Sequence, residues 1–318
     1  MGASILSHIG NTPLVRLTKV CPRDVEIWVK VEGCNPSGSI KDRIALRMIE
    51  DAEKQGKLAP GCRIVEATTG NTGIALSMVA AVKGYRMVVF APRLTSENER
   101  LDIMRAYGAD VRLIDTENEP EMKDGGVHGA YVEFVPRKRC LELERENHDV
   151  WWARQYKNPA NVAAHRETTG REILEQLDGR SIDAFVASVG TGGTLLGVTQ
   201  ALRGHFPNTY VVAVEPASSP ILARGIEKLM VVEDITDGII PEIMRSGSYD
   251  KVITVNDHQA QEVTRRLARE EGLFCGMSGG ANVFACLGIA ADMGRGSRIV
   301  TILPDSFDRY LRKQFYTT

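Results

Sequence analysis

The sequence predicts an α/β protein with mainly parallel sheets, and three observations lead to this fold class. Strand-like runs alternate with helical patterns along most of the chain, as in a parallel sheet with helical crossovers. Several strand-to-helix turns are rich in Gly, Ser and Thr, which is typical of ligand-binding turns in open α/β sheets. The length of 318 residues exceeds the size at which one core usually stops growing, so we expect two lobes.

Each predicted element follows from its hydrophobic pattern, which is a short apolar run for a strand and a 3.6-residue period for a helix. The predicted strands are Cys62–Ala67, Arg86–Ala91, Asp110–Ile114, Ala184–Val189, Tyr210–Val214 and Arg298–Leu303. The predicted helices are Gly73–Lys83, Ser96–Tyr107, Thr194–Arg203, Asp257–Glu271 and Ser278–Met293. The charged, weakly periodic segment Glu117–Asp149 is expected to be irregular loop with a short helix, and a lobe boundary is expected near Trp151–Tyr156.

The composition excludes several classes of protein. A net charge of -2 gives no electrostatic reason to expect nucleic acid or an anionic membrane as the main partner. No apolar run approaches the roughly 20 residues that span a bilayer, and Met1–Gly10 lacks the features of a signal peptide, so we expect a cytoplasmic protein. Six scattered cysteines without C-x-x-C spacing indicate reduced thiols and argue against a zinc site or a disulfide framework.

The turn at positions 190–194 is a candidate phosphate site. It reads Gly190-Thr191-Gly192-Gly193-Thr194 and places backbone N–H groups and two hydroxyls at the start of a helix, where anions bind. The dinucleotide pattern G-x-G-x-x-G fails at Leu195, and no P-loop sequence occurs. We therefore expect a single phosphate monoester here, with an ordinary flexible turn as the alternative.

A second turn could bind a carboxylate. It reads Thr68-Thr69-Gly70-Asn71-Thr72-Gly73 and also precedes a helix, so that hydroxyls, backbone N–H groups and the Asn71 amide could donate to an anion. A structural Thr/Asn capping turn is the alternative.

A third segment places a lysine at a helix start. Ser39 and Asp42 resemble a capping box, which would put Lys41 in the first helical turn. The positive end of a helix favours the neutral amine, the form that a Schiff-base lysine needs. Taken alone, a solvated surface lysine would be the simpler interpretation.

The sequence Gly276-Met277-Ser278-Gly279-Gly280 matches the G-x-S-x-G nucleophile elbow of α/β-hydrolases. That fold requires its catalytic histidine after the serine, and all six histidines precede Ser278. We therefore interpret Ser278 as a hydroxyl at a turn that opens a helix.

Taken together, these motifs resemble the cysteine synthase and cystathionine β-synthase family of fold-type II pyridoxal-phosphate enzymes. The resemblance covers nearly the whole chain. The matching segments are Asn11–Leu14, Asn35–Arg43, Thr68–Gly73, Asn158–Asn161, Thr168–Gly170, Gly190–Thr194, the Ser278 turn and Asp305–Tyr310.

This resemblance implies two three-layer α/β/α lobes with the pyridoxal phosphate in the cleft between them. It implies a larger cofactor-binding domain of residues 1–41 and 156–318, a smaller mobile substrate-binding domain of residues 42–155, and a homodimer. Lys41 would carry the cofactor, Gly190 to Thr194 would cradle its phosphate, Asn71 would bond its ring hydroxyl and Ser278 its pyridine nitrogen. Thr68 to Thr72 and Gln155 would bind the substrate carboxylate.

The activity that the resemblance implies is cysteine synthesis. Sulfide would replace the β-substituent of O-acetylserine, through an aminoacrylate, with Lys41 as general base. A serine beside the pyridine nitrogen leaves the ring neutral, which favours prompt β-elimination. Short segments such as Lys83–Arg86 and Glu271–Gly276 are similar in sequence to the cysteine synthase B branch, which tolerates larger sulfur donors such as thiosulfate.

Thr69 replaces a usual serine, a mild departure from the family pattern that keeps a hydroxyl. Two further departures leave the substrates open: Thr236–Pro241, which contains Asp237, replaces a usual Gly-Ile-Gly turn, and the segment Glu117–Asp149 resembles an insert. A cystathionine β-synthase-like enzyme, an enzyme that uses O-phosphoserine or thiosulfate, and a serine/threonine dehydratase remain alternatives. Arg224 and Arg245 are the candidates for binding a phosphate leaving group. A catalytically silent binding subunit is the alternative from another class.

Overall fold

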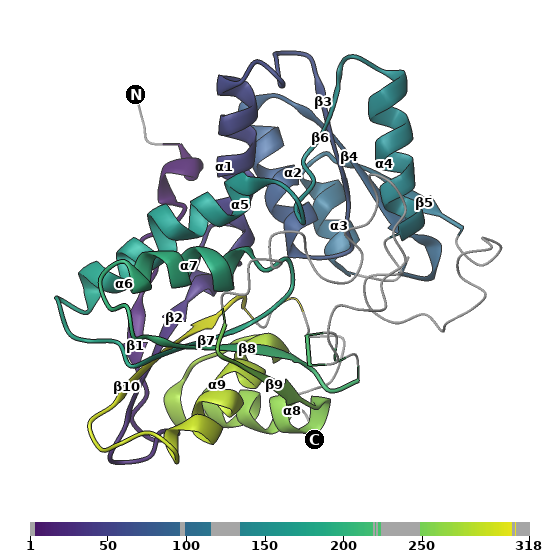
Figure 1. Cartoon of the computed structure of the whole chain (residues 1–318). Coiled ribbons are helices and arrows are strands. Elements are labelled where there is room, and N and C mark those ends of the chain that lie inside the picture. Colours follow the sequence, from purple (N-terminus) through teal and green to yellow (C-terminus); the bar gives the residue numbers. More distant parts are fainter. Residues whose placement is uncertain are drawn as a thin grey trace. The chain divides into compact units, whose positions relative to one another are not determined.

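The computed structural model describes residues 4–95, 99–115, 134–218, 220, 222–223, 249–306 and 309 (Figure 1). The chain forms two compact units, and each is built around its own sheet. Unit 1 contains Met1–Ser7, Lys41–Asn161 and Ile226–Glu242, and unit 2 contains His8–Ile40, Val162–Gly225 and Ile243–Thr318. No helix in the described ranges is long and apolar enough to cross a membrane.

Unit 1 has a parallel four-stranded sheet in the order β5-β4-β3-β6. Its strands are β3 (Arg63–Ala67), β4 (Arg86–Pro92), β5 (Asp110–Ile114) and β6 (Val150–Trp152). Its helices are α1 (Lys41–Lys54), α2 (Asn71–Lys83), α3 (Glu99–Ala106) and α4 (Phe134–Glu146), and a short 3-10 turn, η3, spans Arg93–Thr95. Figure 1 shows α1, α2 and α3 on one side of the strands and α4 on the other.

The face of this sheet that carries Val65 is apolar and packs against α4, as expected for a parallel sheet with helices on its faces. Val65 pairs with Val88 on one side and with Trp152 on the other. These three side chains pack with Cys140 and Leu141 of α4 in one buried cluster. The packing of β3 in this core therefore fixes the position of its carboxyl end and of the Thr68 turn that follows it.

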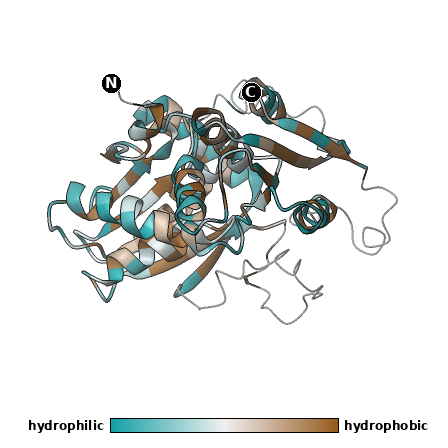
Figure 2. Cartoon of the chain, turned by 90° about the horizontal axis from the view of Figure 1, so that it is seen from above, coloured by the Kyte–Doolittle hydropathy of each residue, from teal (hydrophilic) through white to brown (hydrophobic). Residues whose placement is uncertain are grey.

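Unit 2 has a six-stranded sheet in the order β1-β2-β10-β7-β8-β9, in which only β1 runs antiparallel to its neighbour. Its strands are β1 (Leu14–Arg16), β2 (Glu26–Val31), β7 (Ala184–Ser188), β8 (Tyr210–Pro216), β9 (Lys251–Val255) and β10 (Arg298–Leu303). Its helices include α6 (Arg171–Gln176), α7 (Gly193–Arg203), α8 (Asp257–Arg266) and α9 (Met277–Ala290). Figure 1 shows α6 and α7 on one face and α8 and α9 on the other, and Figure 2 shows that the strands are largely hydrophobic.

Two helical runs in the described chain contain a π-helical turn. The helix α5 (Pro159–Ala164) continues through the π-helix η6 (His165–Gly170) into α6. The helix α8 continues through the π-helix η8 (Leu267–Glu271), so the predicted helix Asp257–Glu271 is present as a single run. Two short 3-10 turns, η1 (Ile5–His8) and η2 (Glu32–Cys34), complete the described elements.

The predicted α/β class with parallel sheets is confirmed, and the predicted elements are present with small shifts at their ends. The sequence patterns did not predict the short strand β1, nor β2, β6 and β9. Strand β2 was missed because Glu26 and Lys30 interrupt its apolar pattern. Lys30 is nevertheless fully buried, and its ammonium donates to the Thr12 carbonyl at 2.6 Å and pairs with Glu172 at 2.8 Å.

The prediction for Glu117–Asp149 needs correction in its second half. Residues 134–146 form the 13-residue helix α4, which is longer than the short helix expected there and covers a face of the sheet. Residues 116–133 lie outside the described residues. The segment Trp151–Tyr156 begins within strand β6, and the chain changes from unit 1 to unit 2 a few residues later, after Asn161.

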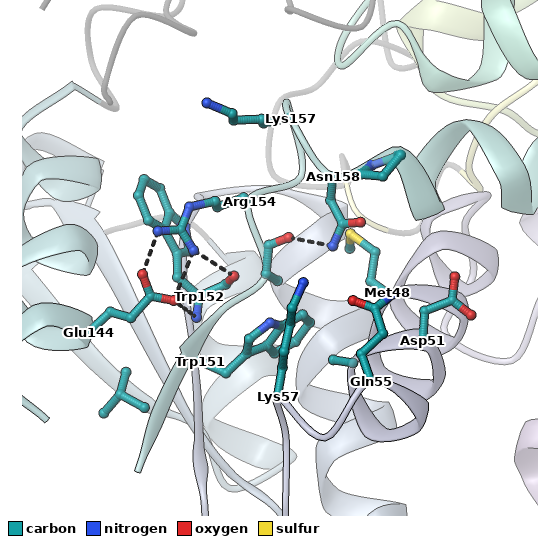
Figure 3. Close-up of a pocket in the computed structure, with 14 residues that line it drawn as sticks. Met48, Asp51, Gln55, Lys57, Glu144, Trp151, Trp152, Arg154, Lys157 and Asn158 are labelled. Carbon is teal, nitrogen blue, oxygen red and sulfur yellow. Dashed lines mark hydrogen bonds and ion pairs between the residues drawn. The ribbon is translucent and has the colours of Figure 1, made fainter. Parts of the chain in front are cut away.

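Strand β6 lies at the edge of its sheet, and side chains occupy its outer backbone groups. The Trp152 N–H donates to Glu144 Oε1 at 3.0 Å, and Asn158 Nδ2 donates to the Ala153 carbonyl at 3.0 Å. Arg154 forms an ion pair with Glu144 and stacks on the Trp152 ring, 4.5 Å from its centroid (Figure 3). Because Glu144 accepts the Trp152 N–H, that N–H is not available to another strand at this edge.

Candidate functional site

Backbone hydrogen bonds connect the residues before Lys41 with residues 304–306. Lys41 is the first residue of α1 and therefore lies in the first helical turn, as predicted. The Ile40 N–H donates to the Pro304 carbonyl at 2.8 Å, and the Ser306 N–H donates to the Gly38 carbonyl at 3.2 Å. Gly38 has φ +82°, and a Cβ there would lie 2.8 Å from the Arg309 guanidinium, so only glycine suits this position.

The predicted capping box at Ser39 and Asp42 stays a prediction. Helix α1 begins at Lys41, two residues after Ser39, and the Ser39 backbone forms a β-bridge with Asp305.

The backbone just before Ser278 pairs with residues 304–306, the segment that also contacts Gly38 and Ile40. Cys275 forms an isolated antiparallel β-bridge with Ser306, and the Gly276 N–H donates to the Asp305 carbonyl at 3.3 Å. Helix α9 begins at Met277, with Gly276 as its N-cap residue. Residues 304–306 therefore connect the backbone that precedes Lys41 with the backbone that precedes Ser278.

The glycines around Ser278 have a packing role, which explains the resemblance to a nucleophile elbow. A Cβ on Gly280 would lie 2.2 Å from the Ala260 carbonyl, where α9 crosses α8. A Cβ on Gly279 would lie 2.8 Å from Cys275 Sγ. Burial raises the pKa of the Cys275 thiol to about 12, and the Asp305 carboxylate adds to this effect, so Cys275 is a neutral packing residue.

A pocket of about 210 Å³ in unit 2 brings Gly190 and Ser278 together. It opens at the carboxyl ends of three neighbouring strands, β7, β8 and β9, where open α/β sheets bind ligands. Gly190 belongs to the predicted phosphate turn and Ser278 is the predicted partner of the ring nitrogen, so two distant segments of the sequence share one pocket.

The phosphate turn has the conformation of an anion site. Gly192 has φ +85° and is the N-cap residue of the 11-residue helix α7, which begins at Gly193. Both glycines and Thr191 are buried, whereas Gly190 is exposed. The backbone N–H groups of the first helical turn have no partners within the helix and can donate to a bound anion.

The same pocket includes residues that the sequence patterns did not single out. Ser188, Glu215 and Asp257 line it. The buried Glu215 carboxylate accepts the N–H groups of Leu222 and Ala223, each at 2.8 Å. A charged residue after the apolar run Val211–Val214 was the signal that could have indicated it.

The carboxylate loop and Gln155 meet in unit 1. The Thr72 hydroxyl donates to Gln155 Oε1 at 2.6 Å, and both residues are buried. Asn71 is the first residue of the 13-residue helix α2, and Gly70 is its N-cap residue. The two parts of the predicted carboxylate site are therefore adjacent.

A buried carboxylate, Glu66, anchors this arrangement, and the sequence patterns missed it. Glu66 Oε2 accepts the Gln155 N–H at 3.0 Å, and Oε1 accepts Trp152 Nε1 at 2.8 Å and the Ala67 N–H at 2.9 Å. Burial raises the pKa of Glu66, although these hydrogen bonds oppose the shift. An acidic residue inside an otherwise apolar strand was the available signal.

The predicted site residues fall into two groups. Lys41, Thr68 to Thr72 and Gln155 belong to unit 1. Gly190 to Thr194 and Ser278 belong to unit 2. Asp237, Arg224 and Arg245 lie outside the described residues.

A larger pocket of about 580 Å³ lies in unit 1 between α1 and β6 (Figure 3). Met48 and Trp151 contribute apolar surface, and Lys57 and the Arg154–Glu144 pair contribute charge. None of the predicted site residues lines it. The candidate active-site chemistry is therefore elsewhere, at the strand ends described above.

Comparisons with known proteins agree with the residue patterns. The family described as "Pyridoxal-phosphate dependent enzyme" matches residues 5–305. A cysteine synthase of Staphylococcus aureus (strain Mu50) is 42% identical over 315 residues, covering 99% of this chain and 97% of that protein. An O-ureido-L-serine synthase of Streptomyces lavendulae is 41% identical over 308 residues, covering 97% of this chain and 90% of that protein.

A solved structure gives the same result for the fold. The O-acetyl serine sulfhydrylase isoform 3 of Entamoeba histolytica superimposes with a TM-score of 0.87 at 35% identity, covering 100% of this chain and 92% of that chain. The fold is therefore that of a fold-type II enzyme, as the sequence motifs indicated.

Proposed function

Because the chain belongs to the family of pyridoxal-phosphate dependent enzymes, we propose that it is a cysteine synthase. It would replace the acetate of O-acetylserine by sulfide and release L-cysteine. The observation that carries this proposal is the 42% identity to a cysteine synthase over 99% of the chain. The arrangement of the strand-end residues supports it.

The donors around the smaller pocket fit a phosphorylated pyridine. The left-handed Gly192 and the start of α7 offer backbone N–H groups to a phosphate, and Thr194 adds a hydroxyl. Ser278, exposed at the start of α9, lines the same pocket and can donate to a ring nitrogen. Gly190 to Thr194 and Ser278 would hold the cofactor, and Lys41 would bind it covalently.

Bound pyridoxal phosphate supplies an electron sink for the substrate α-carbon. Lys41 would take the α-proton of the substrate as general base and later return it. A serine hydroxyl at the ring nitrogen cannot hold that nitrogen protonated as a carboxylate would, which favours loss of the β-substituent over other outcomes. Ser278 would therefore select the reaction, and Lys41 would move the proton.

The carboxylate loop would orient the amino-acid substrate. The start of α2 presents backbone N–H groups and the Asn71 amide, and Gln155 fixes Thr72 through a 2.6 Å hydrogen bond. A carboxylate bound there would hold the α-carbon in one orientation, which is the main requirement for proton removal by a fixed base.

A spectral titration tests the proposed function. The purified yellow protein would be titrated separately with O-acetylserine, O-phosphoserine and serine, while the absorption above the resting band is followed. O-acetylserine should produce the red-shifted absorption band that follows loss of its acetate. Sulfide should abolish this band and form cysteine. If none of the three compounds changes the spectrum, β-replacement of serine derivatives is the wrong assignment.

The relative from Streptomyces lavendulae favours a second candidate, in which an oxygen nucleophile replaces sulfide. A panel of sulfide, thiosulfate, homocysteine and hydroxyurea, offered to the protein with O-acetylserine, separates the candidates. Cysteine synthesis requires the highest kcat/KM with sulfide. Faster turnover with hydroxyurea would assign the chain to O-ureido-L-serine synthesis, and pyruvate release without any nucleophile would assign it to dehydration.

A further inference from the structure

His165 links the phosphate turn to a π-helix in unit 2. It is the first residue of η6 and is fully buried. Its Nε2 lies 3.2 Å from Thr194 Oγ1, and its Nδ1 lies 3.0 Å from Thr169 Oγ1. The imidazole is therefore in hydrogen-bond contact with the hydroxyl that ends the glycine-rich turn.

A neutral imidazole has one donor nitrogen and one acceptor nitrogen, and a threonine hydroxyl has one proton. If Nε2 accepts the Thr194 proton, that hydroxyl presents only lone pairs to a bound anion. If Nε2 donates to Thr194 Oγ1, the Thr194 proton stays available for the anion. The second arrangement requires Nδ1 to accept, and the Thr169 hydroxyl can supply that proton.

We propose that His165 is a positioning residue that directs the Thr194 hydroxyl proton at the cofactor phosphate. The relay runs from the Thr169 hydroxyl to Nδ1, from Nε2–H to Thr194 Oγ1, and from the Thr194 hydroxyl to a phosphate oxygen. No proton is transferred, because each group only orients the next. This inference rests on the proposed pyridoxal-phosphate chemistry and adds a second layer to its phosphate site.

Close helix packing holds His165 in place. A Cβ on Gly197 of α7 would lie 2.4 Å from the Val162 carbonyl and 2.8 Å from His165 Cβ. A Cβ on Gly170 would lie 2.5 Å from Ala201 Cβ. Glycine at both contacts lets η6 and α7 approach so closely that the His165 ring reaches the first turn of α7.

Two substitutions of His165 separate its two contacts. A glutamine amide reaches the position of Nε2, so His165→Gln keeps a donor for Thr194. An asparagine amide reaches the position of Nδ1, so His165→Asn keeps the Thr169 contact and loses the Thr194 contact. His205→Asn is the matched control, because His205 is an exposed histidine just beyond the end of α7.

The experiment compares the binding of pyridoxal phosphate and of pyridoxal, which lacks the phosphate, to the cofactor-depleted full-length protein. His165→Asn should weaken pyridoxal phosphate binding about tenfold, the usual value of one hydrogen bond to a charged group, and leave pyridoxal binding unchanged. His165→Gln and His205→Asn should stay within about threefold of the parent protein for both compounds. The ³¹P resonance of the bound cofactor should shift in His165→Asn and not in His205→Asn.

A double-mutant cycle sharpens the test. His165→Asn should add no further loss to Thr194→Val, because the relay acts only through the Thr194 hydroxyl. Equal weakening of pyridoxal and pyridoxal phosphate by His165→Asn would mean a purely structural role and overturn the proposal. Unchanged pyridoxal phosphate binding in His165→Asn would overturn it as well.

If His165→Asn does not fold, Thr169→Val and Thr169→Ser test the inner end of the relay. Valine should weaken the binding of pyridoxal phosphate but not of pyridoxal, and serine should restore it. Equal affinities in both variants would overturn the proposal. Failure of the proposed function would look different, because the parent protein would then form no borohydride-reducible adduct with pyridoxal phosphate at Lys41.

Discussion

Glu271 shows how one carboxylate can fix a distant turn. It accepts the backbone N–H groups of Thr18 at 2.8 Å, Lys19 at 2.5 Å and Val20 at 2.8 Å. Burial raises the pKa of Glu271, but the hydrogen bonds from this turn outweigh that effect and hold the pKa below its ordinary value. The ionised form is therefore the one that stabilises the folded chain.

We expect Glu271→Gln to lower the free energy of unfolding at pH 7 by about 1–3 kcal/mol, because a neutral amide accepts these N–H groups less well. A carboxyl group with a depressed pKa stabilises above its unfolded-state pKa, and this contribution disappears as the pH falls through the folded-state value. Urea unfolding at pH 7 and at pH 4 should show a smaller difference between parent and variant at the lower pH. A difference that grows on acidification would contradict this account.

Glu66 should affect substrate binding through Gln155. In Glu66→Gln, the amide oxygen can serve Trp152 and Ala67, which leaves the new NH₂ group facing the Gln155 N–H. Two facing donors would displace Gln155 and with it the Thr72 contact. We expect KM for O-acetylserine to rise about tenfold with a smaller change in kcat. Steady-state kinetics measure this, and an unchanged KM would show that Glu66 does not control the loop.

For single residues, the sequence predicted those site residues whose role depends on residues next to them in the chain. Lys41, the Thr68 turn and the Gly190 turn stand at helix starts, and the spacing alone indicates this. Glu66 and His165 could not be predicted in the same way, because their partners are far away in the chain. Glu66 contacts Gln155, which is 89 residues away in the sequence, and His165 contacts Thr194, which is 29 residues away.

At the scale of elements, two glycines in helices have opposite packing environments. A Cβ on Gly197 of α7 would lie 2.4 Å from the Val162 carbonyl, whereas a Cβ on the exposed Gly288 of α9 would meet nothing within 4 Å. We expect Gly197→Ala to lower the free energy of unfolding by about 1–3 kcal/mol through overpacking. Gly288→Ala should raise it by about 0.5–1 kcal/mol, since alanine is the better helix former.

Thermal unfolding of both variants measures these opposite signs. If both glycines gave the same sign, the close approach of η6 and α7 would not be the reason for glycine at 197. A loss of pyridoxal phosphate affinity in Gly197→Ala alone would follow from displacement of His165.

The elements were predicted well where the hydrophobic pattern is long and uninterrupted. The strands Asp110–Ile114 and Arg298–Leu303 have the predicted ends. Strands β1 and β6 are only three residues long, which is too short for a periodic signal. In β2 the buried Lys30 hides the pattern, because its charge is balanced by Glu172, a residue on a different element.

At the scale of the whole molecule, the six thiols report on folding. None of the six forms a disulfide; Cys34 is exposed, Cys21 and Cys62 are partly buried, and Cys140, Cys275 and Cys286 are buried. Burial raises the pKa of both the Cys275 and Cys286 thiols, which removes the reactive thiolate. We expect a disulfide reagent to modify Cys34 rapidly in the folded protein and the three buried thiols only upon unfolding.

Mass spectrometry of the modified peptides checks this order, and Cys34→Ser should remove the fastest-reacting thiol and leave the slower reaction of the partly buried Cys21 and Cys62. Rapid modification of Cys275 in the folded protein would contradict the described attachment of the Ser278 turn to residues 304–306.

The length of the chain was enough to predict two lobes, whereas the division of residues 1–41 and 156–318 from residues 42–155 was implied only by the family resemblance. Unit 2 combines His8–Ile40 with segments from the second half of the chain, so the residue before Lys41 packs against Pro304. No local pattern reveals such a long-range pairing.

The π-helix η6 makes the length of its segment as important as its composition. A π-turn corresponds to one extra residue within an α-helical run. Deleting one residue from His165–Gly170 would allow a regular α-helix from Pro159 to Gln176, but it would rotate one end against the other by about 100°. Substitutions in this stretch can be compensated by other substitutions, whereas a deletion would move His165 out of register with α7. We therefore expect insertions and deletions between Pro159 and Gln176 to be rarer in evolution than substitutions at positions other than His165 and Gly170.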